Sequence, residues 1–140
     1  MTAESNKALH RQFYEEAVNK RNPAVIDEIF SPDWVGHTPG RPDTNRDGLK
    51  QAFNDLGESF SDSHAAIEHQ IAEGDLVGTH VTMSGINTGP FMGMPATGKE
   101  VHYAGVEIVR IVDGKIVEFW GLLDRLTMMQ QLGLTSSPPS

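Results

Sequence analysis

The dipeptide Asp113-Gly114 constrains the fold more than any other feature of this chain, because apolar residues alternate on both sides of it. Asp-Gly in that setting is the strongest short-range signal for a β-hairpin, since a type I′ turn requires positive φ at both central residues. A two-residue turn also fixes the register, with Val112 opposite Lys115. We therefore expect residues 98–126 to form two long strands that run into a helix capped by Asp124.

Extending that register predicts which side chains share a face of the hairpin. It sets Glu107 opposite Trp120 and Tyr103 opposite Asp124, and directly paired residues point to the same side of a sheet. One face is then expected to carry Tyr103, Glu107, Glu118, Trp120 and Asp124. The other face is expected to be apolar, with Val106, Ile108, Val117, Phe119 and Leu123. Three carboxylates beside a tyrosine and a tryptophan suggest a functional site.

Helices are expected in the first part of the chain. Apolar residues recur at helical spacing over residues 2–20, and Asn22-Pro23 marks the start of a second, short helix. Thr44 and Asp47 resemble a capping box for a third helix, whose apolar residues continue to Phe60.

Strands are expected in the second part. Residues 64–73 and 76–86 alternate with a period of two and are predicted to pair about Gly74-Asp75. Together with the Asp-Gly hairpin they give a four-stranded antiparallel sheet, so the sequence predicts one α+β domain over residues 1–134. Residues 135–140 offer almost nothing to bury and are expected to be disordered.

The composition narrows the classes of partner. The 140 residues carry a formal net charge of −8 and a pI of about 5.1, which disfavours nucleic acid and anionic membrane surfaces. No apolar run approaches the roughly 20 residues of a membrane span, and residues 1–13 lack an apolar signal core, so a cytoplasmic protein is expected. Cysteine is absent, which excludes disulfides, thiol nucleophiles and thiolate metal ligands. A small or neutral partner is the expectation.

Several motifs resemble the SnoaL-like polyketide (ester) cyclases, a branch of the nuclear transport factor 2-like superfamily. The similarity extends from about Lys7 to Gly133. The segments that carry it are His37-Thr38-Pro39-Gly40, Ala72-Glu73-Gly74-Asp75, the glycine-rich stretch from Thr88 to Lys99, the stretch from Asp113 to Glu118, the spacing of Trp120 and Asp124, and Gln130-Gln131-Leu132-Gly133. The resemblance implies a cone-shaped α+β barrel, with N-terminal helices on a curved, mainly antiparallel sheet and a short C-terminal helix.

The resemblance also implies an activity. In the cyclases the aspartate that matches Asp124 is the general acid/base of an intramolecular aldol condensation that uses no cofactor. We therefore expect an enzyme in which Asp124 transfers protons on a small, apolar, carbonyl-bearing substrate. The chain has Asn87 where many relatives have histidine and His80 where many have arginine, and both positions could contact ligand. A non-catalytic small-molecule binding protein and a hydrolase, hydratase or hydroxylase-like enzyme of the same fold are alternatives.

Each candidate residue also has a structural interpretation. An aspartate directly before a helix, such as Asp124, is an expected N-cap, and capping and catalysis can coexist. The six histidines show neither HxH nor HExxH spacing, so no metal site is expected. The residues expected to contact substrate are Trp34, His37, Phe53, His80, Phe91, Met92, Tyr103, Glu107 and Trp120.

Two apolar surfaces require a cover. Phe91, Met92 and Met94 lie in an irregular loop, where they either close a hydrophobic cavity or contact a second subunit. The apolar face of the hairpin, which includes Val106 and Ile108, is expected to be buried sheet to sheet in a homodimer.

Overall fold

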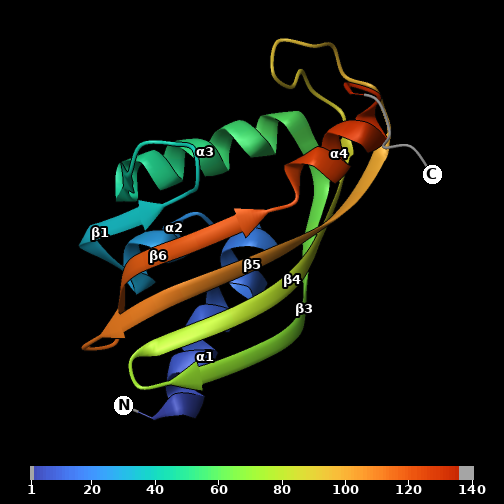
Figure 1. Cartoon of the computed structure of the whole chain (residues 1–140). Coiled ribbons are helices and arrows are strands. Elements are labelled where there is room, and N and C mark those ends of the chain that lie inside the picture. Colours follow the sequence, from blue (N-terminus) through green and yellow to red (C-terminus); the bar gives the residue numbers. More distant parts are fainter. Residues whose placement is uncertain (1, 136–140) are drawn as a thin grey trace.

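The structure, a computed structural model, describes residues 2–135. Its centre is one curved six-stranded sheet with the strand order β2-β1-β6-β5-β4-β3 (Figure 1). Neighbouring strands are antiparallel except β1 and β6, which run parallel. The strands are β1 (Phe30–His37), β2 (Thr44–Asn45), β3 (Phe60–Glu73), β4 (Leu76–Asn87), β5 (Glu100–Val112) and β6 (Lys115–Leu123).

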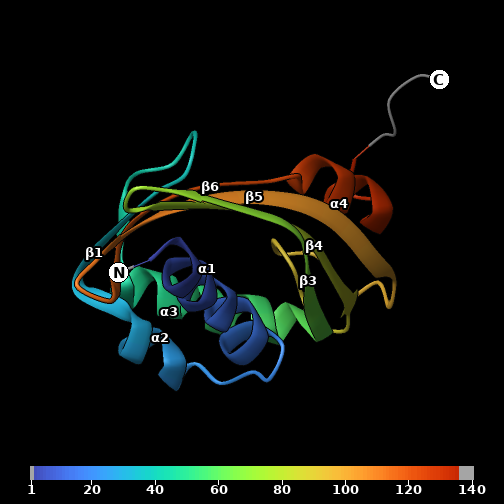
Figure 2. The same cartoon turned by 90° about the horizontal axis from the view of Figure 1, so that it is seen from below.

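The sheet arches over the N-terminal helices, which lie on its concave side (Figure 2). The helices are α1 (Ala3–Gln12), the π-helix η1 (Phe13–Val18), α2 (Ala24–Ile29), α3 (Arg46–Ser59) and α4 (Arg125–Leu132). Between sheet and helices lies the main core, which includes Tyr14, Ile26, Phe30, Trp34 and Val109. A smaller cluster joins α4 to β5 through Met128, Leu132, Val101 and Tyr103.

The predicted α+β class is confirmed, with helices on a curved, mainly antiparallel sheet and a short C-terminal helix. The sheet has six strands rather than four, because residues 30–37 form a full strand beside β6 and residues 44–45 add an edge strand. The sheet does not close into a barrel, since β2 and β3 are its two edges. Apart from Thr135, the tail expected to be disordered over residues 135–140 lies outside the described residues.

Both predicted hairpin turns are present. Asp113 and Gly114 have φ values of 50° and 74°, as a type I′ turn requires. The strands beside them begin in the predicted register, with Val112 opposite Lys115. The turn at Gly74-Asp75 joins β3 to β4, and its glycine also has a positive φ, of 60°.

A β-bulge overturns the predicted register beyond the Asp-Gly turn. Ile111 pairs with Ile116, but the next pair is Arg110 with Glu118, so Val117 is an extra residue in β6. Side chains alternate between the two faces of a strand, so one inserted residue sends every later side chain to the opposite face.

The bulge exchanges the two faces predicted for β6. Gly121 lies opposite Glu107, and Trp120 lies opposite Ile108 on the convex face. The prediction that Glu118, Trp120 and Asp124 share a face with Tyr103 and Glu107 is therefore wrong. Phe119 and Leu123, predicted on the outer face, instead point to the concave side, where they line a cavity described below.

The start of α3 differs from the prediction by one residue. Asn45, rather than Thr44, is the N-cap, and its side chain accepts a hydrogen bond from the Gly48 backbone at 2.9 Å. Thr44 belongs to the short edge strand β2. At the other end, Phe60 opens β3 instead of closing the helix.

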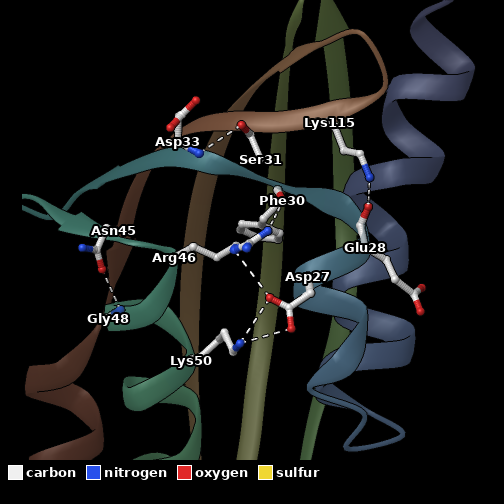
Figure 3. A network of polar contacts seen from close by, with 10 residues as sticks. All are labelled: Asp27, Glu28, Phe30, Ser31, Asp33, Asn45, Arg46, Gly48, Lys50 and Lys115. Atoms are coloured by element: carbon white, nitrogen blue, oxygen red, sulfur yellow. Dashed lines mark hydrogen bonds and ion pairs between the residues drawn. The ribbon is translucent and has the colours of Figure 1, made fainter.

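Polar contacts fix α3 against α2 and β1 (Figure 3). Asp27 of α2 pairs with Lys50 at 3.1 Å and with Arg46 at 3.5 Å. Arg46 also donates a hydrogen bond to the Phe30 carbonyl at the start of β1, at 3.2 Å. These contacts hold the N-terminal part of α3 against α2 and the start of β1. Its position matters because α3 forms one wall of the cavity described below.

Gly114→Ala is expected to destabilise the hairpin. An added methyl group would meet no atom within 4 Å, so the cost comes from the positive φ alone and should be about 1–2 kcal/mol. Gly78→Ala in β4 is the matched control, because its methyl group would make an ordinary contact with Ile71 at 3.5 Å. Urea unfolding of both variants measures the difference, and equal free energies of unfolding would contradict the turn assignment.

Candidate active site

A cavity of about 230 Å³ lies between the helices and the concave face of the sheet. Its wall is mainly apolar, with Leu49, Phe53 and Leu56 from α3 and Met83, Phe119 and Leu123 from the sheet. A second compartment of about 160 Å³ adjoins it. The two compartments share Glu107, Phe119, Leu123 and Arg125.

Glu107 is the acidic group at the junction of the two compartments. Its side chain projects from the middle of β5 and is only 9% exposed. Burial raises the pKa of Glu107 to about 7, although the hydrogen bond from Tyr14 acts in the opposite direction. A carboxyl group with a pKa near neutrality can both take up and release a proton at physiological pH.

Gly121 leaves room beside that carboxyl group. It is the cross-strand partner of Glu107, and it occupies the position that a regular register would give to Trp120. A methyl group at position 121 would lie 2.5 Å from the Phe119 ring and 3.4 Å from Glu107 Oε2. The bulge thus places the smallest residue where the cavity needs space.

Tyr14 holds the Glu107 carboxyl group from the helical side. The tyrosine is 1% exposed, and its hydroxyl group donates a hydrogen bond to Glu107 Oε1. It belongs to the π-helix, in which Asn19 N bonds to the Tyr14 carbonyl at 2.9 Å, and such turns are frequent at functional sites. Burial and the neighbouring Glu107 raise the pKa of Tyr14, which therefore remains a neutral donor.

His10 packs behind Tyr14, one helical turn earlier. Its ring centroid lies 5.0 Å from that of the tyrosine, and its Nδ1 atom is 2.8 Å from Thr79 Oγ1. Burial lowers the pKa of His10 to about 3, so the imidazole is neutral at physiological pH. Thr79 is also the neighbour of Glu107 in the β4–β5 register, which links this buried group to the site.

Asp124 lies at the end of β6, away from the cavity. It is exposed and caps α4, accepting hydrogen bonds from Thr127 Oγ1 at 2.6 Å and Thr127 N at 3.1 Å. These bonds lower the pKa of Asp124. The expected N-cap is confirmed, whereas the expected position opposite Tyr103, on the same face as Glu107, is wrong because of the bulge. The catalytic role of Asp124 stays a prediction.

His37 and Trp120 lie in an outer groove of about 450 Å³ on the convex side. His37 bridges Asp43 at 2.8 Å and Glu118 at 2.7 Å, and its ring stacks on Trp120 at 5.5 Å. The hydrogen bonds to Asp43 and Glu118 raise the pKa of His37. Asp43, the carboxylate in the groove wall, is exposed and paired, so the inner cavity is better suited to proton transfer on an apolar molecule.

The other residues expected to contact substrate are dispersed. Phe53 lines the cavity, and Tyr103 lies on the same face of β5 as Glu107. Trp34 is buried in the core behind Phe119, with ring centroids 5.9 Å apart. His80 does not reach the cavity, because it stacks on His69 with their Nδ1 atoms 3.1 Å apart. Within residues 2–135 no cluster of three or more histidine, aspartate or glutamate side chains could hold a metal ion.

The irregular loop between β4 and β5 is held by Asn87 and does not line the cavity. The Asn87 side chain donates to the Ser59 and Gly89 carbonyls and accepts from Thr97, at 2.8–3.0 Å. Of the two loop residues expected to contact substrate, Phe91 packs on Phe60 and Met92 is 65% exposed.

Three site residues were missed from the sequence, namely Tyr14, Arg41 and Arg125. Tyr14 could have been found, because it follows His10 by four residues on the apolar side of the first helix. Arg125 offers a weaker signal, since a cation in the first turn of a helix opposes the helix dipole. Arg41 lies in a loop, and no local pattern marks it.

Glu107→Gln is expected to change how stability depends on pH. The folded protein keeps the Glu107 proton up to about pH 7, whereas the ordinary carboxyl value is 4.5, so the stability contributed by Glu107 falls as pH rises through this window. Glutamine is neutral throughout. The free energy of unfolding of the variant relative to the parent should therefore rise between these pH values, by an amount on the order of 3 kcal/mol. Urea unfolding at several pH values measures this difference, and a constant difference would contradict a raised pKa.

None of the helices in residues 2–135 has the length and apolar character needed to cross a membrane.

Comparison with known proteins gives consistent matches. A family profile described as SnoaL-like polyketide cyclase matches residues 8–132. The chain is 32% identical to the aklanonic acid methyl ester cyclase DnrD of Streptomyces peucetius over 107 residues, which are 76% of this chain and 72% of that protein.

Solved structures of proteins with similar sequences have the same fold as this chain. AclR, a proposed hydroxylase from Streptomyces galilaeus, superimposes with a TM-score of 0.91 at 27% identity, covering 99% of this chain and 87% of that chain. IdmH, a proposed polyketide cyclase from Streptomyces antibioticus, gives a TM-score of 0.82 at 30% identity, covering 91% of this chain and 98% of that chain.

Proposed function

This chain belongs to the SnoaL-like polyketide cyclase family, and we propose that it catalyses an intramolecular aldol condensation or a related acid/base reaction in the cavity around Glu107. The substrate would be a small, apolar compound that bears carbonyl groups. One observation carries the proposal: a single buried carboxyl group, with its pKa raised to about 7, lies in an apolar cavity and is held by a neutral tyrosine.

The reaction needs one group that first accepts and then donates a proton. The Glu107 carboxylate removes a proton from a carbon between two carbonyl groups, which leaves an enolate. The enolate carbon attacks a third carbonyl carbon, elsewhere in the same molecule, and forms the new carbon–carbon bond while that carbonyl group becomes an alkoxide. The protonated Glu107 then gives its proton to the resulting alkoxide, so the product is an isomer of the substrate.

The protein environment supports both steps. Leu49, Phe53 and Phe119 exclude water and keep the Glu107 pKa high enough for the carboxyl group to act as an acid after it has acted as a base. The hydrogen bond from Tyr14 engages one carboxyl oxygen, which orients the group and leaves the other oxygen for the substrate.

Asp124 is the competing candidate for the acid/base group. The family resemblance assigns Asp124 this role. Asp124 differs from Glu107 in that it caps a helix through Thr127 and is exposed to solvent. To meet Asp124 in this conformation, a substrate would have to bind beside the end of β6, where Asp124 lies between Leu123 and Arg125. Variants of the two carboxylates can separate these roles.

Glu107→Gln should reduce cyclisation by roughly 10²–10⁴-fold, because an amide cannot exchange a proton. Aklanonic acid methyl ester, the compound in the relatives' names, and the corresponding free acid are the substrates for the assay. Asp124→Asn is the matched control, since asparagine also caps helices, and it should retain activity close to that of the parent. Loss of activity in Asp124→Asn with full activity in Glu107→Gln would reverse the assignment.

The pH profile gives an independent readout of the same group. A base must be deprotonated, so kcat/KM should rise with pH through about 7 in the parent protein. Tyr14→Phe removes the hydrogen bond that lowers the Glu107 pKa, so this rising limb should move to higher pH.

We also propose a homodimer that buries the convex face of the β5–β6 hairpin. Val106, Ile108 and Leu122 are 51%, 41% and 62% exposed there, and apolar clusters on a sheet face commonly form contacts between subunits. Light scattering at micromolar concentration is expected to show a dimer, and Leu122→Lys is expected to shift it toward monomer. A parent protein that is monomeric under these conditions would rule the dimer out.

A further inference from the structure

Two arginines lie beside the second compartment without an acidic partner. Arg41, from the loop between β1 and β2, and Arg125, at the start of α4, both line this compartment together with Glu107. Within residues 2–135 neither guanidinium group takes part in an ion pair or a side-chain hydrogen bond. They act on each other instead: desolvation and the charge of Arg41 both lower the pKa of Arg125.

The carboxylates nearby are engaged elsewhere. Asp43 pairs with His37, and Asp124 accepts hydrogen bonds from Thr127. Glu118 lies between His37 and Arg110 on the convex face. Glu107 also lines this compartment, but within residues 2–135 its carboxyl group forms no ion pair and is bonded by Tyr14 instead. Two like charges at the edge of an apolar cavity are therefore left for an anion supplied from outside the chain.

We propose that Arg41 and Arg125 form a carboxylate subsite, and that the substrate is an apolar carbonyl compound with a free carboxylate at one end. This rests on the proposed function, because the rest of the molecule occupies the cavity around Glu107. Guanidinium groups bind carboxylates through paired, charge-assisted hydrogen bonds, which lysine or neutral residues cannot reproduce.

The dimensions of the site agree with this division. Each compartment alone, at about 230 and 160 Å³, is smaller than the roughly 300–1,000 Å³ of typical ligand pockets, whereas the two together fall within that range. Arg125 lines both compartments and Arg41 only the smaller one, whereas the rest of the larger compartment is mainly apolar, so an amphipathic molecule would place its carboxylate in the smaller. Glu107 then lies beside the middle of the substrate, where proton transfer is required.

Binding of two matched probes tests the subsite without any turnover. Anthraquinone-2-carboxylate and anthraquinone-2-carboxamide have nearly the same shape and differ in charge. They are titrated into the protein at pH 6, where Glu107 is mainly neutral, and Kd is measured by calorimetry. The parent protein should bind the carboxylate at least 10-fold more tightly than the amide. Arg125→Gln and Arg41→Gln should each reduce this preference to about threefold or less.

Two further variants locate the effect. Arg21 lines the larger compartment, where it packs over Phe53 at 6.0 Å, and Arg21→Gln should leave the preference unchanged. Arg11→Gln, remote from the cavity and bonded to Gln70, controls for net charge. The proposal is overturned if the parent shows no preference, if it binds neither probe, or if Arg21→Gln rather than Arg125→Gln removes the preference. Because Glu107→Gln should keep the preference, a failure of the proton-transfer proposal would be distinguishable from a failure of the subsite.

Discussion

The site depends on one extra residue in β6. The bulge at Val117 moves Gly121 opposite Glu107 and sends Trp120 to the convex face. With a regular register the indole of Trp120 would occupy the concave side next to the carboxyl group, where a single methyl group at position 121 already comes within 2.5 Å of the Phe119 ring. The cavity therefore exists because the strand is irregular. β-Bulges are common beside active sites for this reason, since they re-aim side chains without breaking the sheet.

Most of the fold could be predicted from the sequence, because its signals are local. The Asp113-Gly114 turn, the Gly74-Asp75 turn and the caps at Asp124 and Gly133 each depend on a few adjacent residues. The bulge could not be predicted in this way. Val117 follows another apolar, β-branched residue, Ile116, and either face of β6 offers a reasonable hydrophobic partner, so the alternation of residues does not reveal where the register slips. The pairing of β1 with β6 could not be predicted for the same reason, because it is a parallel contact between residues about 80 apart.

The candidate site was predicted in part, and the register of β6 accounts for the errors at Trp120 and Asp124. Glu107, Tyr103 and Phe53 were placed on the concave side correctly, because β5 and α3 follow their simple periods. Trp120 and Asp124 were placed there through the assumed register of β6, and His37 was expected to contact substrate, but the structure puts all three elsewhere. Tyr14 lies on a helix, and no local pattern indicates the partner of its hydroxyl group. Its hydroxyl group in fact reaches Glu107, 93 residues later in the chain.

Charge placement distinguishes residues that serve stability from residues that serve the cavity. Elsewhere the described ion pairs connect elements of the fold. Asp27 joins α2 to α3, and Arg110 of β5 pairs with Asp75 in the turn between β3 and β4. Arg125 does the reverse. It occupies the first position of α4, where the positive end of the helix dipole disfavours a cation, and burial and the charge of Arg41 lower its pKa. Glu107 is comparably unfavourable, since its charge is buried without a cation. Both groups adjoin the same two compartments, and such unfavourable placements are the expected consequence of a site shaped for a ligand.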